Sequence, residues 1–373
     1  MRHILICTAG ASLLMNLRNL KDPSLQGALR DQNLFPLTQF LMGCDNTDRR
    51  CGAEINSITS IFHKGLLDNL GRLIFLVSDT DDGILIGKLL KQYYEQTSNS
   101  IRFKAVEYRV LSGLKDDDIH AFKQKGLRNL VHEISAEVRK FSAETIAINA
   151  TGGYKAQISF AGMIGQALDI PVYYLFEKFS EVIELPPQPI ALDLSLWLNH
   201  YLLFEQLETD SLIEKSTLTA ENLFVGNNLE ALLDQEEING RSYVSLSAMG
   251  VLFHERSRLQ FEKQKTTLLS LIPTDDTLPK TKKIHIRDDH GKDILEAFAL
   301  KICHSPYVKS VINSLPFNPN MSDCIRRTFA DGKVEFVLHW TDRGLGMCVQ
   351  TTGRNLAETN SIALHLKHEY EKS

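Results

Sequence analysis

The chain has 373 residues, 43% of them hydrophobic and 23% charged, with a formal net charge of −5 at pH 7. That length favours two or three domains, and the net charge disfavours a protein that coats nucleic acid over its whole surface. No apolar run approaches the roughly 20 residues that a membrane-spanning helix needs. The start, MRHILICTAG, is typical of a core strand rather than a signal peptide. The six cysteines lack metal-ligand spacing, so we expect reduced thiols, no metal and a cytoplasmic protein without a membrane partner.

Strand-like apolar runs alternate with amphipathic stretches over residues 1–192. The runs are HILICTA, RLIFLVS, RFKAVEYRV, TIAINA and VYYLF, and helical spacing is found in GILIGKLLKQYYEQ and DIHAFKQKGLRNLVHEISAEVRKF. This alternation predicts a doubly wound, Rossmann-like parallel sheet of the α/β class. Ligands of such sheets bind beyond the carboxyl ends of the strands. Here the strand ends carry CTAGASLL, VSDTDDG and NATGGYK. In the second of these, we expect Asp79, Asp81 and Asp82 to cap the next helix rather than hold a metal.

Residues 193–275 are predicted to form a helical, winged-helix-like linker. A helix is expected at LWLNHYLLFEQLE. The later stretch LEALLDQEEINGRSYVSLSAMGVLFHERSRLQFEK predicts a helix, a hairpin at NGR, a short strand and a second helix. That is the outline of a winged helix-turn-helix. Because its presumed recognition elements carry few basic residues, we favour a dimerisation or linker module over a DNA-binding one.

The last region, residues 280–373, is predicted to be an α+β domain with an antiparallel sheet. It follows PTDDTLPKTKK, a polar stretch typical of a linker, and it contains six of the 12 histidines. It holds 14 Lys and Arg against 11 Asp and Glu, whereas the rest of the chain is acidic. We expect KKIHIRD as a strand and KDILEAFALKICHSPYVKSVINSL as one or two helices. DCIRRTFAD, KVEFVLHW and GMCVQTT are expected to form an antiparallel meander, and NLAETNSIALHLKHEYEK a closing helix.

The turns in CTAGASLL and NATGGYK have the chemistry of an anion site. Backbone amides at a glycine-rich turn and at a helix N-terminus carry partial positive charge, and Lys155 adds a full one. Neither stretch has the spacing of a P-loop or of G-x-G-x-x-G. A turn without a ligand is therefore the commoner explanation for either stretch alone.

Taken together, LICTAGASLL and INATGGYK resemble the signature loops of CARF domains, the Rossmann-like sensors of CRISPR-associated effectors that bind cyclic oligoadenylates. The first loop departs from the usual T-x-G-T-S-L-L at Ala11, and the second matches N-x-T-G-G-[FY]-K fully. The resemblance covers roughly the first half of the chain. It implies a homodimer that binds the ring, most simply cyclic tetra-adenylate, across its two-fold axis. The ligand-binding residues that it implies are Thr8, Gly10, Ala11, Ser12, Asn149, Thr151, Gly152, Gly153, Tyr154 and Lys155.

The same resemblance raises a second activity for this region. Some members of the family slowly cut the ring by attack of a 2′-OH, using the serine of the first loop and the lysine of the second. Ser12 and Lys155 stand at those positions. Ring cleavage by the sensor is therefore an open expectation.

The C-terminal region resembles the RelE-type mRNA interferases in its order of elements, over about ninety residues. It has neither the R-x₄₋₆-H of HEPN ribonucleases nor the spaced carboxylates with lysine of metal-dependent nucleases. Metal-free RNA cleavage needs a base for the 2′-proton, cations for the phosphorane and an acid for the 5′-oxygen. The catalytic candidates are Arg326, Arg327, His339, Arg343, Arg354 and His365, with His368 as a further acid or base and Trp340 as a surface for base stacking.

Two features leave the acid and base roles open. Arg326 and Arg327 are neighbours on a strand and face opposite ways, so at most one reaches a substrate from a given sheet face. Glu335 stands where many RelE relatives have an arginine. For each candidate taken singly, a structural role is an equally good explanation. The hypothesis of a catalytic site therefore rests on the presence of all these candidates in one region.

Our leading interpretation is a ribonuclease activated by cyclic oligoadenylate. It needs no metal or cofactor, and by resemblance it cuts mRNA on ribosomes, in the A site. One alternative is a transcription regulator that responds to cyclic oligoadenylate and uses residues 193–275 as a DNA-binding winged helix. Another is an enzyme that mainly degrades the ring and whose C-terminal region recruits partners.

Overall fold

A computed structural model describes residues 2–176, 181–188, 192–220, 227–287, 291–315, 324–338 and 344–370. The chain divides into two compact units. Unit 1 comprises Met1–Ala191, Glu230–Asp234 and Ser247–Glu255, and unit 2 comprises Leu192–Leu229, Gln235–Leu246 and Arg256–Ser373. Residues 193–275, treated above as one region, thus contribute to both units.

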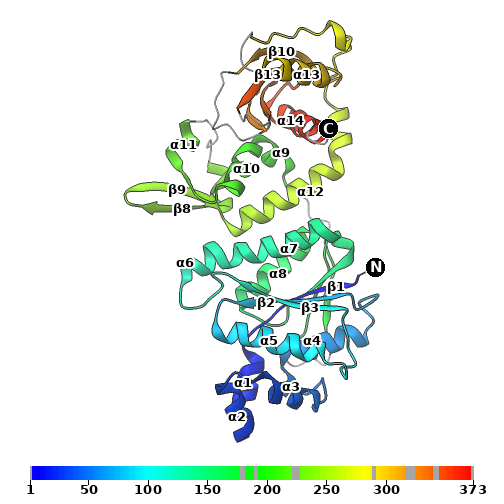
Figure 1. The fold of residues 1–373 in the computed structure, drawn as a ribbon, viewed down its shortest axis with the longest axis vertical. Coiled ribbons are helices and arrows are strands. Elements are labelled where there is room, and N and C mark those ends of the chain that lie inside the picture. The colour runs from blue at the N-terminus through cyan, green and yellow to red at the C-terminus, as the bar shows by residue number, and fades with distance from the viewer. Residues whose placement is uncertain are drawn as a thin grey trace. The chain divides into compact units, whose positions relative to one another are not determined.

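Unit 1 is built on a six-stranded sheet in the order β3-β2-β1-β4-β5-β6 (Figure 1). The strands are β1 (Ile4–Thr8), β2 (Arg72–Ser78), β3 (Ala105–Leu111), β4 (Ile146–Asn149), β5 (Val172–Tyr174) and β6 (Ile183–Leu185). The first five pair in parallel, which confirms the predicted parallel-sheet core. Strand β6, which the sequence did not predict, pairs antiparallel with β5.

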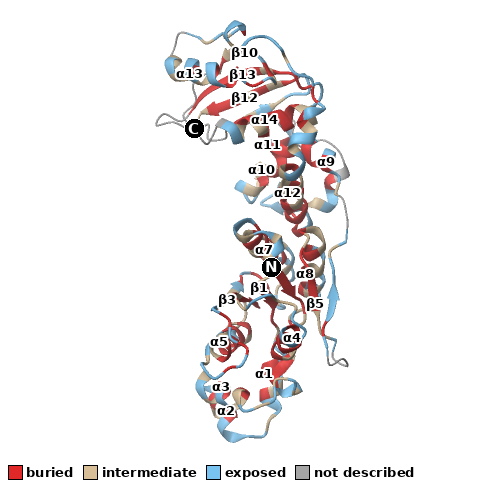
Figure 2. Ribbon diagram, turned by 90° about the vertical axis from the view of Figure 1, so that its right-hand side faces the viewer, coloured by how far each residue is buried: buried red, intermediate tan, exposed pale blue. Residues whose placement is uncertain are grey.

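Helices cover both faces of this sheet (Figure 1). One side carries α1 (Ser12–Asn19), α2 (Pro23–Arg30), α3 (Leu34–Met42), α4 (Gly52–His63) and α5 (Asp81–Glu95). The other carries α7 (Leu127–Phe141), preceded by α6 (Ile119–Ala121) and a π-helical turn at Phe122–Gly126, and α8 (Lys155–Ala167). All five residues of β1 are buried, as expected for a central strand covered on both faces, and Figure 2 shows the buried residues inside these layers.

The predicted cap of α5 is wrong. The cap is Thr80, whose hydroxyl accepts a hydrogen bond from the Gly83 amide at 3.0 Å. Asp79 instead accepts from the Gly113 amide at 2.9 Å, and Asp82 pairs with Arg18 at 2.6 Å. The side chain that caps a helix belongs to the residue directly before its first turn, and here that residue is Thr80, which lies between two aspartates.

The middle of the chain contains helices and a small sheet. The helices are α9 (Leu194–Asn199), α10 (Tyr201–Thr209), α11 (Lys215–Ala220) and α12 (Ala248–Ser270), and β7 (Ile213–Glu214), β8 (Leu233–Ile238) and β9 (Arg241–Leu246) form a sheet in the order β7-β9-β8. The prediction of a helix at LEALLDQEE is wrong, because a short 3₁₀ helix there leads directly into β8. Asn239 and Gly240, with φ of 52° and 76°, form the turn between β8 and β9, which confirms the predicted hairpin at NGR.

Unit 2 ends in a four-stranded antiparallel sheet in the order β10-β13-β12-β11. The strands are β10 (Val308–Ser314), β11 (Ile325–Thr328), β12 (Lys333–Leu338) and β13 (Leu345–Thr351). Helix α13 (Lys292–Ile302) contacts β10 and β13, and α14 (Leu356–Tyr370) packs on β11 and β12. The predicted meander and closing helix are confirmed.

Two elements before the meander differ from expectation. The second half of the stretch predicted as helical is β10, in which Val308 and Val311 are buried and β-branched residues recur. In KKIHIRD, the described residues up to Arg287 form an isolated parallel bridge, between Ile284 and Val311, in place of the expected strand.

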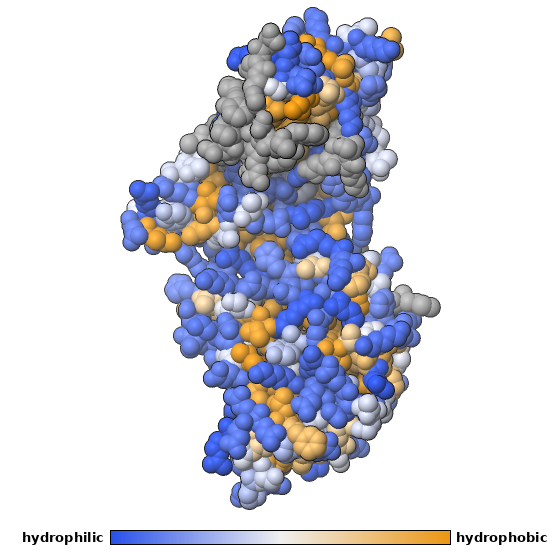
Figure 3. All heavy atoms as spheres, in the orientation of Figure 1, coloured by the Kyte–Doolittle hydropathy of each residue, from blue (hydrophilic) through white to orange (hydrophobic). Residues whose placement is uncertain are grey.

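Hydrophilic side chains predominate on the face of the molecule in Figure 3. Among the helices that the structure describes, none combines the length and the apolar composition needed to cross a bilayer. The six cysteines are free thiols.

Candidate functional site

The sheet of unit 1 brings the two predicted glycine loops together. Strands β1 and β4 are adjacent and parallel, with Cys7 opposite Asn149, so both loops leave the sheet at the same edge. The Thr8 hydroxyl donates a hydrogen bond to the Gly152 carbonyl. A Cβ on Gly10 would lie only 2.5 Å from the backbone nitrogen of Gly153. The loops therefore contact each other backbone to backbone, which only glycine at position 10 allows.

The second loop needs its glycines as well. A Cβ on Gly152 would lie 2.0 Å from the Glu54 Oε1 atom. Gly153 has a φ of +107°, a backbone conformation that residues with a side chain rarely adopt. The glycines thus let the backbone of this loop lie close to neighbouring groups such as the Glu54 carboxylate.

A buried polar network fixes the course of this loop. Asn149 Nδ2 donates to the Ser57 hydroxyl at 2.8 Å, and the Thr151 hydroxyl donates to Asn149 Oδ1 at 2.6 Å. The Leu175 amide in turn donates to the Thr151 hydroxyl oxygen at 3.0 Å. Asn149 and Thr8 are both 1% exposed, so in this structure they support the loops rather than face solvent.

The remaining predicted ligand-binding residues are more accessible. Ala11, Ser12 and Lys155 are exposed, and Gly10, Thr151, Gly153 and Tyr154 are half-buried. Ser12 and Lys155 are the first residues of α1 and α8. Two helix N-termini thus begin at the loops, where amide hydrogens favour an anion.

Glu54, on α4, is a residue of this site that the sequence did not reveal. Its carboxylate is fully buried, and Oε1 accepts a hydrogen bond from the Gly10 amide at 2.8 Å. Oε2 is buried without a hydrogen-bond partner among the described residues. Burial raises the pKa of this carboxyl, an effect that the Gly10 amide opposes. Glutamate in a first helical turn is common as a complement to the helix dipole, so nothing in the sequence distinguished it.

A cavity of about 870 Å³ opens beside the loops. Ser12 comes from the first loop and Thr151 from the second, and Arg49, His63 and Lys64 bring basic groups from residues around α4. The other lining residues are Asn16, Thr47, Ala53, Asn56, Thr59, Ser60, Leu175, Phe176 and Glu181. Lys64 is paired with Glu181 at 2.8 Å. Polar, basic and aromatic groups around one cavity suit a ligand with phosphates and bases. Lys155 is not among the lining residues.

The structure distributes the catalytic candidates of unit 2 over several places. Arg326 and Arg327 are on β11, where Arg326 forms an ion pair with Glu335 at 3.6 Å and Arg327 is exposed. Arg354 precedes α14 and is bound to Glu358 at 2.7 Å. Its guanidinium also donates to the Leu271 carbonyl at 3.3 Å. The predicted residues His339, Trp340 and Arg343 lie outside the described part of the chain.

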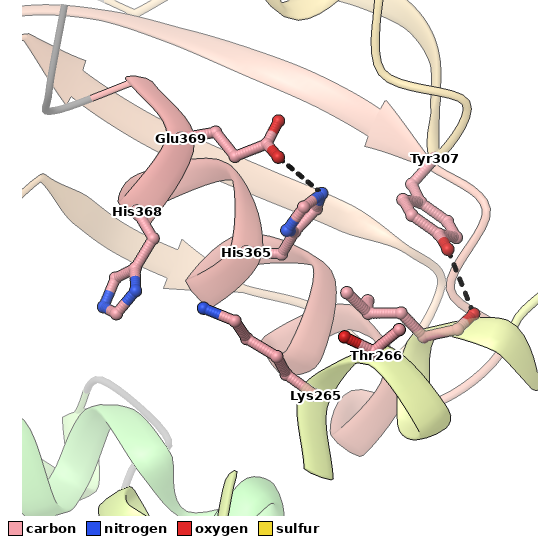
Figure 4. Close-up of a pocket in the computed structure, with 7 residues that line it drawn as sticks. Lys265, Thr266, Tyr307, His365, His368 and Glu369 are labelled. Atoms are coloured by element: carbon pink, nitrogen blue, oxygen red, sulfur yellow. Dashed lines mark hydrogen bonds and ion pairs between the residues drawn. The ribbon is translucent and has the colours of Figure 1, made fainter. Parts of the chain in front are cut away.

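His365 lines a second cavity, of about 660 Å³, in unit 2 (Figure 4). The residues around it are Lys265, Thr266, Leu269, Tyr307, His365, His368 and Glu369. His365 and His368 were candidates from the sequence, whereas the contribution of α12 and Tyr307 was not anticipated. Neither Arg326 nor Arg354 is among the lining residues.

A family model matches part of unit 1. Residues 49–188 match a family model described as CRISPR-associated protein (Cas_APE2256). The matched segment includes Glu54 and the second glycine loop and supports the predicted CRISPR-associated resemblance of this region. The first loop precedes it.

Two solved structures show weak overall likeness. One is Can2 from Sulfobacillus thermosulfidooxidans in complex with cyclic tetra-adenylate, with 12% identity over 74% of this chain and 68% of Can2, at a TM-score of 0.24. The other is protein VC1899 from Vibrio cholerae, with 11% identity over 83% of this chain and 87% of that protein, at a TM-score of 0.21. Neither likeness is close enough to carry an argument about this chain.

Proposed function

We propose that this protein is a CRISPR-associated effector that is activated by a cyclic oligoadenylate, most simply cyclic tetra-adenylate, bound at the glycine loops of unit 1. The supporting observation is the contact between the loops of β1 and β4 beside a polar cavity to which both contribute, at Ser12 and Thr151. The match of residues 49–188 to a CRISPR-associated family supports the same assignment.

The chemistry of the loops suits a phosphodiester ring. The amides at the starts of α1 and α8 offer hydrogen bonds to phosphate oxygens, and Lys155 offers charge at the same edge. A ring of four equivalent nucleotides has two equivalent halves, so a homodimer would present one pair of loops to each half. Ser12 and Lys155 remain the groups through which the sensor would cut its own ligand.

The output that we propose is cleavage of mRNA without a metal, in the A site of the ribosome. The antiparallel sheet with its closing helix, and the excess of basic over acidic residues in 280–373, support it. Ligand binding would favour one arrangement of the dimer, and this requires different affinities of the ring for the two arrangements.

Calorimetric titration of the purified protein with cyclic tetra-adenylate tests the sensor. We expect saturable binding of one ring per two chains, and an absence of binding to rings of any size would refute the proposal. Mapping of cut sites on translated mRNA, with and without the ring, tests the output. A sequence-specific shift of promoter DNA, with mRNA intact, would favour the transcription-regulator alternative instead.

A further inference from the structure

The second cavity collects titratable side chains from three separate elements of unit 2. Lys265 lies on α12, His365, His368 and Glu369 lie on α14, and Tyr307 precedes β10 (Figure 4). Its volume of about 660 Å³ is in the range of pockets that take a small ligand or a nucleotide. It is lined by groups that can transfer protons and by the Lys265 ammonium.

His365 is held in a defined position. Its ring packs edge-to-face on the Tyr307 ring, with 5.8 Å between centroids and an interplanar angle of 88°. Its Nε2 atom lies 3.7 Å from Glu369 Oε1, and the Tyr307 hydroxyl is tied to the Leu269 carbonyl at 3.2 Å. The side chain is only 18% exposed. Burial lowers the pKa of His365, which favours the neutral imidazole that a general base requires.

His368 and Lys265 share one carboxylate. His368 Nδ1 lies 3.4 Å from Glu262 Oε1, and Lys265 Nζ lies 2.9 Å from Glu262 Oε2. Figure 4 shows the Lys265 ammonium pointing toward the two histidines. Glu262 thus connects the cation of α12 to the second imidazole of α14. The groups that face His365 are Glu369 and His368 from α14, Lys265 from α12 and the Tyr307 ring.

The spacing of the two histidines suits a phosphodiester. Residues three apart on a helix have Cβ atoms roughly 5–6 Å apart on the same face. Side chains with that Cβ spacing leave room for a phosphate group between their imidazole rings, with one ring near the attacking oxygen and the other near the leaving oxygen. The arginines of the sheet cannot fill these roles, because a guanidinium does not release its proton in proteins.

We propose that this cavity is the cleavage site for RNA, with His365 as general base, His368 as general acid and Lys265 as the cation that stabilises the phosphorane. The inference rests on the proposed ribonuclease function and assigns its active site to α12 and α14. His365 takes the proton of a ribose 2′-OH, and O2′ forms a bond to phosphorus. The P–O5′ bond breaks, and His368 gives its proton to O5′. The products are a 2′,3′-cyclic phosphate and a 5′-hydroxyl end.

The test measures single-turnover cleavage of translated mRNA by the full-length protein with saturating cyclic tetra-adenylate. The variants are His365→Gln, His368→Gln and Lys265→Met. The control is His304→Gln, the same substitution on an exposed histidine of unit 2 that is not a lining residue of the cavity. We expect each histidine variant to lose about 100-fold or more in rate, Lys265→Met to lose activity as well, and the control to keep the wild-type rate.

The pH profile separates a catalytic from a structural role. We expect the wild-type rate to rise with pH as His365 loses its proton, with a midpoint below the usual histidine value, and this acidic limb to vanish in His365→Gln. His368 is 43% exposed, so we expect its variant to fold even if the more buried position does not tolerate a change. Wild-type cleavage with unchanged rates in both histidine variants would overturn the inference and leave the proposed function intact. An inactive wild type would overturn both.

Discussion

The sites of the two units are built in opposite ways. In unit 1, the candidate ligand site consists largely of backbone at the ends of two neighbouring parallel strands, and glycines such as Gly10 and Gly152 let that backbone come close. In unit 2, the candidate active site consists of side chains on the faces of two helices that are far apart in the sequence. A backbone site leaves a local sequence motif, whereas a side-chain site assembled from distant elements does not.

The two sites also differ in the environment of their acidic side chains. The first loop of unit 1 contacts the buried Glu54, whose carboxylate accepts a hydrogen bond from the Gly10 amide, and burial raises the pKa of this acid. In unit 2 the acids Glu262 and Glu369 lie at 36% and 54% exposure and pair with Lys265 and histidines. Solvent screens those pairs, so they orient groups more than they stabilise the fold.

The largest expected effect comes from adding a methyl group to the loop contact. Gly10→Ala and Gly152→Ala each place a Cβ within 2.5 Å of a neighbouring atom, so the loops must separate and ring binding should be lost in calorimetry. Gly27→Ala is the matched control, since nothing lies within 4 Å of its Cβ position in α2. That change should stabilise the protein by about 0.5–1 kcal/mol and leave binding intact. Undiminished binding by Gly10→Ala would contradict the backbone site.

The next effect concerns the hydrogen bond between the loops. Thr8→Val keeps the shape of a buried side chain but removes the hydroxyl that donates to the Gly152 carbonyl. We expect a loss of about 1–3 kcal/mol in the free energy of unfolding, because a buried carbonyl is left unpaired. Chemical denaturation measures this loss, and ring affinity should weaken in the same variant. An unchanged midpoint would show that the loops do not depend on each other.

Substitution of Glu54 is expected to have a smaller effect on the stability of the protein, and to raise that stability rather than lower it. Because the folded protein raises the pKa of this acid, folding takes up a proton, and stability falls as pH rises above the usual value of 4.5. Glu54→Gln keeps an oxygen for the Gly10 amide and removes the titration. Thermal melts should therefore show a variant at least as stable as the wild type at pH 7–8 and a weaker dependence on pH above 4.5. A variant less stable at pH 8 would indicate that the charged carboxylate is required.

The smallest effect is expected from substitution of Arg354. This variant tests whether catalysis in unit 2 depends on side chains of its helices or on the arginines of its sheet and loops. The side chain is committed to Glu358 and the Leu271 carbonyl, so Arg354→Gln should slightly lower the melting temperature and reduce mRNA cleavage less than tenfold. A loss as large as that expected for His365→Gln would return Arg354 to the catalytic role that the RelE resemblance implies.

The elements predicted well are those with a strong local pattern. Strands β1, β2 and β4 are apolar runs, and α5 and the stretch that ends in α7 have helical spacing, so burial and periodicity both indicate them. The prediction failed where a turn or a neighbouring strand outweighed the local pattern. The hairpin at NGR was predicted, but its first arm, β8, extends through a segment that was expected to be helical, and pairing with β13 made β10 a strand.

The parallel-sheet class of unit 1 and the positions of both glycine loops could be read from the amino-acid sequence, because glycine spacing and strand ends are local properties. The hydrogen bond from the Gly10 amide to Glu54, and the cavity that Lys265, Tyr307 and His365 line together, became visible only in the folded chain. These residues are brought together by chain crossings over long sequence distances. No local sequence pattern predicts these contacts, because an acid in a first helical turn or a lysine on a long helix is most often only a solvated charge.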